Sequence, residues 1–201
     1  MKTGNRSRRT TLLGLLTAIL MVFGMTPLGY LNIGPLAISF NMIPVAIGAA
    51  ALGPVGGAIL GAVFGMTSFL QCLGIGGSSA MGVILLQINP LFAFLQRFVP
   101  RVTAGFLVGV IYRLTRRFCK PGLAGSIAGF CAAMLNTVLF MGALILLFGN
   151  TQYLTDLIAG RNVIVFICTF VGVNAVAEAL ATTAVTGALC AALERSGLLR
   201  G

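Results

Sequence analysis

Residues 44–67 restrict the fold of this chain more than any other stretch. They carry no charge, and half of them are glycine or alanine. Gly53-Pro54 interrupts the stretch, because proline cannot continue a helix that reaches it and glycine tolerates the turn. We therefore expect two membrane helices joined by almost no loop. In the second helix, Gly57 and Gly61 lie one turn apart on a flat face, which either packs inside a bundle or docks on another protein.

Composition places the whole chain in the membrane class. Of its 201 residues, 58% are hydrophobic and 8% are charged, and the mean hydropathy is +1.06. Soluble domains have about 25% charged residues. Because one span takes about 20 apolar residues, the length allows about five to seven helices. We expect an all-α membrane protein, organised as a single domain over residues 1–201.

Six spans are expected, at residues 11–25, 41–52, 55–70, 102–114, 123–148 and 161–193. The second has about 12 residues, or ~18 Å of helix, which is short of the ~30 Å hydrocarbon core. Residues 28–40 before it are therefore expected to form a structured external loop, with a strand-like piece, that dips into the protein. Residues 83–99 are expected to form a partly buried or re-entrant segment, and residues 149–160 a polar loop.

Basic residues indicate the orientation, because cytoplasmic loops of membrane proteins collect lysine and arginine. With the N-terminus inside, ten of the 13 basic residues fall in cytoplasmic segments, which include residues 1–10 and 194–201. The three exceptions are Arg97, Arg101 and Arg161. This distribution predicts six spans with both termini in the cytoplasm. It also accounts for the net charge of +10 without a nucleic-acid partner.

Composition excludes several kinds of chemistry. The chain has no histidine, which excludes histidine-based triads and histidine-ligated metals. Its five cysteines are scattered, and we interpret them as small hydrophobic residues. No G-x-x-x-x-G-K-[ST] motif occurs, so the chain does not hydrolyse ATP by that route. With three acidic residues in all, we expect no enzyme, no cofactor and no metal.

Four polar residues fall inside the fifth and sixth spans: Asn136, Thr137, Asn174 and Glu178. Asn136 and Asn174 each lie about 12 residues, or ~18 Å, below the outer end of their span, so two antiparallel spans bring them to one depth. Such groups either form interhelical hydrogen bonds, worth about 0.6 kcal/mol on average, or contact a ligand. Glu178 is alternatively a proton site or a structural partner of backbone N–H groups.

Arginines mark the outer ends of two spans. Arg101 is expected to open the fourth span at the outer surface, directly after Pro100, with Arg97 one turn earlier. Arg161 opens the sixth span. These residues either snorkel at the interface or stand at the mouth of a cavity, where a guanidinium binds a carboxylate through two hydrogen bonds. A cationic mouth above neutral amides suits a small, polar anion.

Residues 43–68, 99–114, 132–149 and 174–185 resemble the pantothenate-type substrate-binding S components of energy-coupling factor (ECF) transporters. The shared features are the Gly-Pro hairpin, the Leu-Asn-Thr stretch around Asn136, and the pair of Asn174 and Glu178. The resemblance implies a six-helix subunit of the bacterial plasma membrane that captures a vitamin, here pantothenate, from outside. It would dock on a transmembrane coupling protein and two ABC ATPases.

The resemblance also guides the assignment of residues. The external loop and the outer parts of the last three spans would form the pocket, with the substrate carboxylate on Arg101. The expected substrate contacts are Arg101, Asn136, Thr137, Asn174, Glu178, Arg97, Tyr30 and Asn41. The expected docking surface for the coupling protein comprises Gly14 and Ala18 of the first span together with Gly57 and Gly61.

Two alternatives stay open on the sequence. The first is an S component for a different vitamin or small metabolite. The second is a small ion-coupled secondary transporter in which Glu178 relays protons. That class usually has internal repeats and more spans, and we recognise neither in this sequence.

Overall fold

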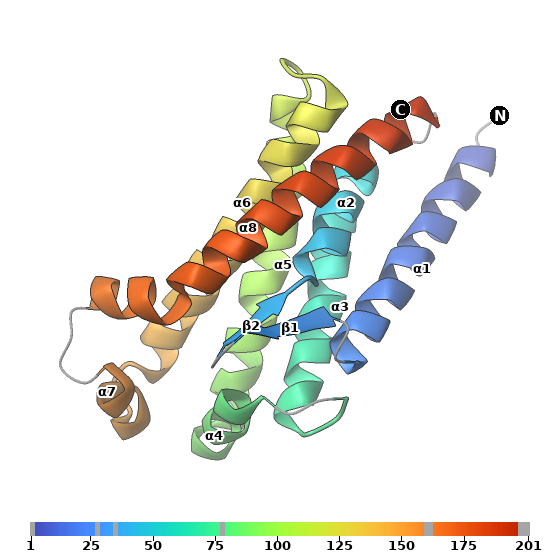
Figure 1. Cartoon of the computed structure of the whole chain (residues 1–201). Coiled ribbons are helices and arrows are strands. Elements are labelled where there is room, and N and C mark those ends of the chain that lie inside the picture. The colour runs from blue at the N-terminus through green and yellow to red at the C-terminus, as the bar shows by residue number, and fades with distance from the viewer. Residues whose placement is uncertain (1–2, 27–28, 34–35, 77–78, 159–162, 197–201) are drawn as a thin grey trace.

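The computed structural model describes residues 3–26, 29–33, 36–76, 79–158 and 163–196. Within these ranges the chain forms eight helices and one two-stranded sheet (Figure 1). In chain order the elements are α1 (Thr3–Met25), β1 (Tyr30–Ile33), β2 (Leu36–Ser39), α2 (Met42–Leu52), α3 (Pro54–Cys72), α4 (Ala80–Ile88), α5 (Pro90–Thr115), α6 (Pro121–Phe148), α7 (Gln152–Ile158) and α8 (Val163–Arg195).

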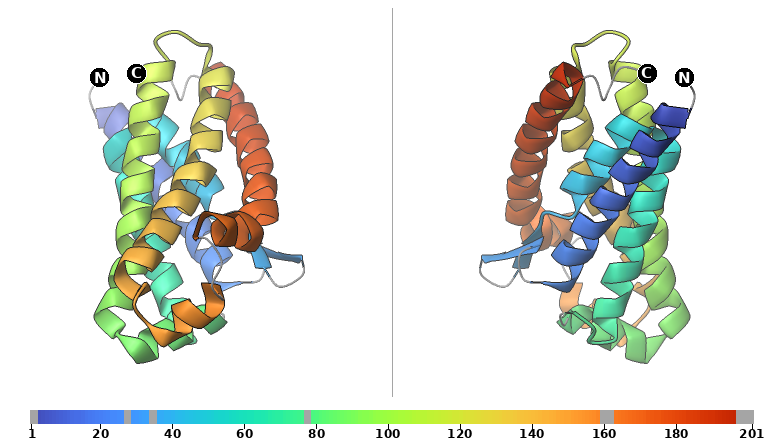
Figure 2. Two further views of the ribbon diagram at one scale, coloured as in Figure 1. Left: turned by 90° about the vertical axis from the view of Figure 1, so that its left-hand side faces the viewer. Right: turned by 90° about the vertical axis from the view of Figure 1, so that its right-hand side faces the viewer.

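The long helices stand side by side in one bundle (Figures 1 and 2). The start of α1 and the end of α8 lie at one end, called the terminal end below, whereas α4 and α7 lie at the other, the distal end. Among the described residues, five helices are long and apolar enough to cross a membrane, and α2 is shorter with 11 residues. The helical membrane fold is therefore confirmed, with the addition of a small β-hairpin.

The α2–α3 hairpin has the form that Gly53-Pro54 predicts. Gly53 ends α2 with a φ of 83°, in the left-handed region that favours glycine. Pro54 is the first residue of α3, a position where the missing N–H of proline has no helical partner to lose. The two helices are thus joined without an intervening loop.

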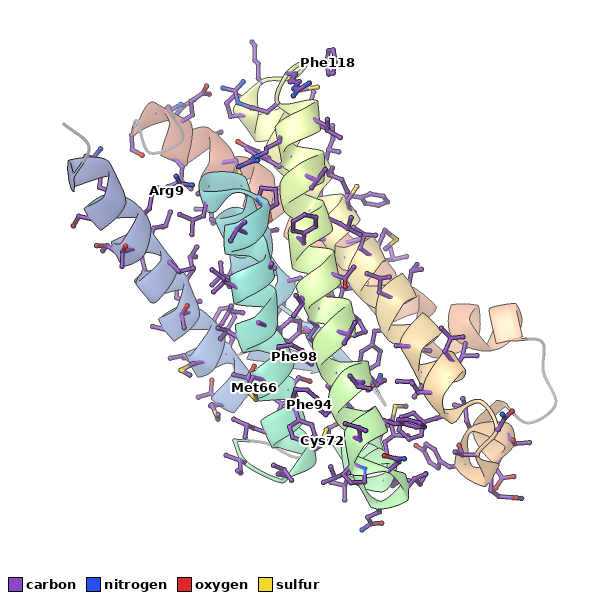
Figure 3. All side chains as sticks on the ribbon, turned by 180° about the vertical axis from the view of Figure 1, so that it is seen from behind. Arg9, Met66, Cys72, Phe94, Phe98 and Phe118 are labelled. Atoms are coloured by element: carbon purple, nitrogen blue, oxygen red, sulfur yellow. The ribbon has the colours of Figure 1, made fainter. Side chains whose placement is uncertain are left out.

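The glycine face of α3 is buried against α5. A Cβ atom on Gly57 would collide with the carbonyl oxygen of Gly105, and one on Gly61 with that of Arg101. Towards the distal end, Phe98 of α5 lies beside α3 in the same contact (Figure 3). The expectation that Gly57 and Gly61 belong to a docking surface is wrong, because their missing side chains allow two backbones to approach inside the bundle.

Helix α1 lies on the outside of the bundle against α2 and α3 (Figure 2). It is the least buried of the five long apolar helices. Gly14 has open space where a Cβ atom would stand, and Ala18, one turn later, is exposed. The small residues of α1 therefore lie on an outer face, and the partner of that face remains a prediction.

The structure corrects the expected boundaries around Pro100. Residues 83–99 do not form a separate re-entrant segment, and the fourth long helix does not begin at residue 102. Instead α4 ends at Ile88, and α5 runs without a break from Pro90 through Pro100 to Thr115.

Two local features explain why α5 extends so far. The side chain of Asn89 caps the helix by accepting hydrogen bonds from two backbone N–H groups of the first turn, at 3.1 and 3.2 Å. Pro100 is tolerated inside a membrane helix when other groups satisfy the backbone around it. In the turn before the proline, the guanidinium of Arg101 donates to the carbonyl oxygen of Arg97 at 2.6 Å, although the carbonyl that Pro100 itself leaves without a helical N–H partner is that of Gln96.

Two connecting segments contain regular structure. Strands β1 and β2 pair antiparallel with Tyr30 opposite Ser39, which confirms the strand-like piece expected within residues 28–40, and β2 contacts α8. Residues 149–160, expected to form a polar loop, contain α7 instead. The hydroxyl of Thr151 supports its start by accepting from a backbone N–H three residues later, at 3.4 Å.

Candidate functional site

Two arginines of α5 are buried in the bundle. Arg97 is 7% exposed and Arg101 is 6% exposed. Arg101 lies ~17 Å along the helix from Pro90 and ~21 Å from Thr115. The expectation that Arg101 opens a span at the outer surface is wrong, because the helix begins three turns earlier. Neither residue snorkels at an interface.

Aromatic rings hold the two guanidinium groups in place. The guanidinium carbon of Arg101 lies 4.4 Å from the ring centre of Phe64 on α3 and 5.1 Å from that of Phe140 on α6. The guanidinium carbon of Arg97 lies 5.2 Å from the same Phe140 ring. Such cation–π contacts lower the cost of keeping a cation away from water. They occupy the faces of a guanidinium, whereas hydrogen bonds form along its edge.

Arg97 also connects two elements at the distal end. Its guanidinium donates to the Ser68 hydroxyl of α3 at 3.3 Å and to the Ser79 hydroxyl at 3.1 Å. Ser79 in turn caps α4 by accepting from the backbone N–H of Gly82 at 3.2 Å. Arg97 therefore fixes α4 to the bundle, and Arg101 is the arginine nearer to the middle of its helix.

Glu178 of α8 belongs to the same cluster. It is 8% exposed, interacts electrostatically with Arg101, and accepts a hydrogen bond from the backbone N–H of Ser39. Its Oε1 atom has no hydrogen-bond partner among the described residues. The carboxyl group thus joins α8 to β2 and to α5. The sequence left open a ligand contact, a proton site and a structural bond to backbone N–H groups, and the structure shows the last of these.

The cluster carries a surplus of positive charge. It brings together two guanidinium groups and one carboxyl group, so its net charge is at least +1. The chain has two other acidic residues. Glu194 forms an ion pair with Arg116 at 2.9 Å near the terminal end, and Asp156 is exposed on α7. Buried charge is costly unless an opposite charge accompanies it, and a bound anion would supply that charge.

Buried amide groups add hydrogen-bonding capacity. Asn41 is fully buried before α2, where its amide donates to the Ser39 hydroxyl at 3.1 Å. Its Oδ1 atom, like that of Asn136 on α6, has no partner within the described part of the chain. Buried polar atoms normally have hydrogen-bond partners. A buried polar atom that lacks a partner destabilises the protein by about 1–3 kcal/mol. Acceptors in this state suit a ligand with hydroxyl or N–H donors.

Three residues near the arginines were not expected from the sequence. Gln96 is fully buried and has neither amide atom bonded among the residues described. In the sequence Gln96 only interrupts an apolar stretch. The one feature that indicates a role in the site is its position directly before Arg97. Phe64 and Phe140 have no signal at all, because nothing in their sequence context separates them from ordinary core residues.

The register of α6 and α8 supports the expected common depth. A Cβ atom on Gly129 would meet the carbonyl oxygen of Thr182. Seven residues further along α6 is Asn136, and seven residues back along α8 is Ala175, next to Asn174. Thr137 is half-buried on α6, and its substrate role remains a prediction. The side chains of Asn174 and Tyr30, and the whole of Arg161, lie outside the described residues.

These features define a helical protein with apolar helices long enough to cross a membrane and a buried cluster of net positive charge. Residues 8–190 match the family model described as ECF transporter, substrate-specific component. The chain therefore belongs to this family of transporter components, which are not enzymes, and the resemblance seen in the sequence is confirmed. It is also similar to the pantothenic acid transporter PanT of Lactococcus lactis subsp. cremoris (strain MG1363), with 25% identity over 173 residues that cover 79% of this chain and 85% of that protein.

Proposed function

We propose that this chain is the substrate-capture subunit of an ECF importer and that its substrate is pantothenate. One observation carries the proposal: a buried cluster of net positive charge lies among buried acceptors that have no partner in the described structure. Pantothenate is a monoanion with one carboxylate, one secondary amide and two hydroxyl groups. Its charge offsets that of the cluster, and its hydroxyl groups supply the donors that the acceptors need.

Each polar group has a definite task in this binding mode. The substrate carboxylate lies along the guanidinium edge of Arg101, which the rings of Phe64 and Phe140 hold by cation–π contacts. The hydroxyl groups donate to Asn41 and Asn136. Charge-assisted hydrogen bonds of this kind contribute about 1.5–3 kcal/mol, and neutral ones about 0.5–1.5 kcal/mol.

The distribution of charge supports one orientation in the membrane. Exposed basic residues gather at the terminal end, namely Arg8, Arg9, Arg113, Arg116, Arg117, Lys120 and Arg195; Figure 3 shows Arg9 there. By the positive-inside rule this end faces the cytoplasm. Counting α2 as a short sixth span, both termini are cytoplasmic and the distal end faces outward from the bacterial plasma membrane.

Transport would depend on partner proteins. We infer that a transmembrane coupling protein and two ABC ATPases complete the importer, and that the coupling protein contacts the open face of α1 around Gly14 and Ala18. No ATP-binding motif of the P-loop type occurs in this chain, which agrees with a need for ATPase partners.

Binding and uptake test this proposal separately. Purified protein is expected to bind tritiated pantothenate at micromolar concentration, and absence of binding rejects pantothenate in favour of another vitamin. Cells that express the chain are expected to lose uptake when the ATPase partners are deleted. Uptake that persists without them rejects the S-component mechanism and favours an ion-coupled transporter with Glu178 as the proton site.

A further inference from the structure

The side chain of Gln96 is a buried polar group that has no task in the binding mode above. It is fully buried, and both its amide oxygen and its amide nitrogen lack hydrogen-bond partners in the described ranges. A group in this state carries a desolvation cost in the ligand-free protein. A protein normally avoids that cost by placing an apolar residue, so the retained amide indicates a partner that arrives with the ligand.

The position of Gln96 agrees with this interpretation. It lies on the buried side of α5, directly before Arg97 and ~7.5 Å along the helix axis from Arg101. Ala93, one turn earlier, packs in a cluster with Met141 of α6. Phe140, the residue before Met141, contacts both guanidinium groups. Gln96 therefore lies at the level of the aromatic ring that holds the two arginines.

We propose that Gln96 recognises the secondary amide of the bound ligand, an inference that rests on the proposed function. Its Nε2 donates to the ligand carbonyl oxygen, and its Oε1 accepts from the ligand N–H. A primary amide offers one donor and one acceptor side by side, which matches a secondary amide. Two methylene groups separate the amide from the carboxylate in pantothenate. With Arg101 on the carboxylate and Gln96 on the amide, the site is specific for the distance between these two groups.

The inference predicts opposite effects of one substitution on stability and on binding. Gln96→Leu keeps the approximate size of the side chain and removes both unbonded polar atoms. The ligand-free variant is therefore expected to have a Tm equal to or above that of the wild type. Its affinity for pantothenate is expected to fall about tenfold or more, since two hydrogen bonds are lost. A merely structural glutamine would give a lower Tm.

A comparison of two proteins with two ligands tests the assignment. The ligands are pantothenate and its oxygen ester, in which an ester oxygen replaces the amide N–H, and affinities are measured by titration of the purified full chain. The wild type is expected to bind the ester about fivefold or more weakly than pantothenate, the scale of one hydrogen bond. In Gln96→Leu the two affinities should become equal within about twofold. Gln87→Leu, at an exposed position of α4, is the matched control and should keep the wild-type preference.

Three results would overturn the inference. A lower Tm of ligand-free Gln96→Leu means that Gln96 bonds another part of the protein. An unchanged preference for the amide over the ester in this variant means that another residue reads the amide. If the wild type binds pantothenate normally, either result rejects Gln96 alone. If the wild type does not bind pantothenate at all, the proposed substrate is rejected and this inference with it.

Discussion

Adding one methyl group to Gly61 should separate two helices and disturb the cationic site. In Gly61→Ala the new Cβ atom would overlap the carbonyl oxygen of Arg101 and would lie 2.9 Å from its carbonyl carbon and 3.1 Å from the Cα of Val102. Carbon atoms in contact prefer separations of about 3.5–4.0 Å, so α3 and α5 must move apart by roughly 1 Å. Neither backbone can rotate away as a flexible side chain would.

The cost has two parts. Overpacking of a helix contact costs about 1–3 kcal/mol. The shift also loosens the contact between Phe64 on α3 and Arg101 on α5, now 4.4 Å, and a desolvated cation–π contact contributes up to about 2 kcal/mol. Together these give about 1–5 kcal/mol, which for a chain of this size lowers Tm by about 2–20 °C.

The assay is thermal unfolding of the purified protein in detergent. Circular dichroism is the suitable probe, because the chain contains no tryptophan. Gly14→Ala is the matched control, since no atom lies within 4 Å of the added Cβ, and its Tm should stay near that of the wild type. Pantothenate affinity should fall in Gly61→Ala and stay unchanged in Gly14→Ala.

The opposite pattern would refute this reasoning. If Gly61→Ala keeps the wild-type Tm and affinity but transports no substrate, the glycine face of α3 docks on a partner protein instead of packing against α5. A large loss of Tm in Gly14→Ala would mean that α1 packs against the bundle through that face.

The same contacts support three further predictions. Gly53→Ala should lower the free energy of unfolding by about 1–2 kcal/mol because of the positive φ alone, and by more because the side chain of Arg113 occupies the space of the new Cβ atom. Gly74→Ala is the control, since Gly74 has a φ of 79° and open surroundings. In the same unfolding assay it should show only the backbone cost. Asn136→Ala should weaken pantothenate binding about twofold to tenfold by removing one acceptor, and a tritiated-ligand titration that finds unchanged affinity would remove Asn136 from the site. Arg101→Lys keeps the charge but loses the planar fork, so the same titration should show about tenfold weaker binding, and an equal affinity would mean that a point charge suffices.

Features that depend on local chemistry could be predicted from the sequence. Gly53-Pro54 specifies the hairpin because a positive φ and a missing N–H act within two adjacent residues. The long apolar helices follow from hydropathy, since a membrane span must satisfy its own backbone hydrogen bonds. The common depth of Asn136 and Asn174 follows from counting residues along two antiparallel helices.

Features that depend on distant residues could not be predicted in this way. Pro100 indicated a helix start, but Asn89 begins the helix three turns earlier and Arg101 bonds the nearby Arg97 carbonyl. That expected start placed the two arginines at the outer surface. Phe64, Phe140 and Glu178, which lie on three other helices, lower the cost of burying them.

The glycine face of α3 shows a further limit of sequence patterns. Glycines at intervals of four residues predict close approach of another backbone, but the pattern does not say which backbone. Only the contact with α5 distinguishes packing at Gly61 from the open surface at Gly14.

The most direct test of the central claim is a titration of the purified protein with pantothenate and with pantothenol, in which a CH₂OH group replaces the carboxylate. If the buried cationic cluster binds the carboxylate, pantothenate binds and pantothenol binds at least about tenfold more weakly, the scale of a lost charge-assisted hydrogen bond. Equal affinity for the two ligands would contradict this claim, because the net positive charge around Arg101 would then have no part in recognition.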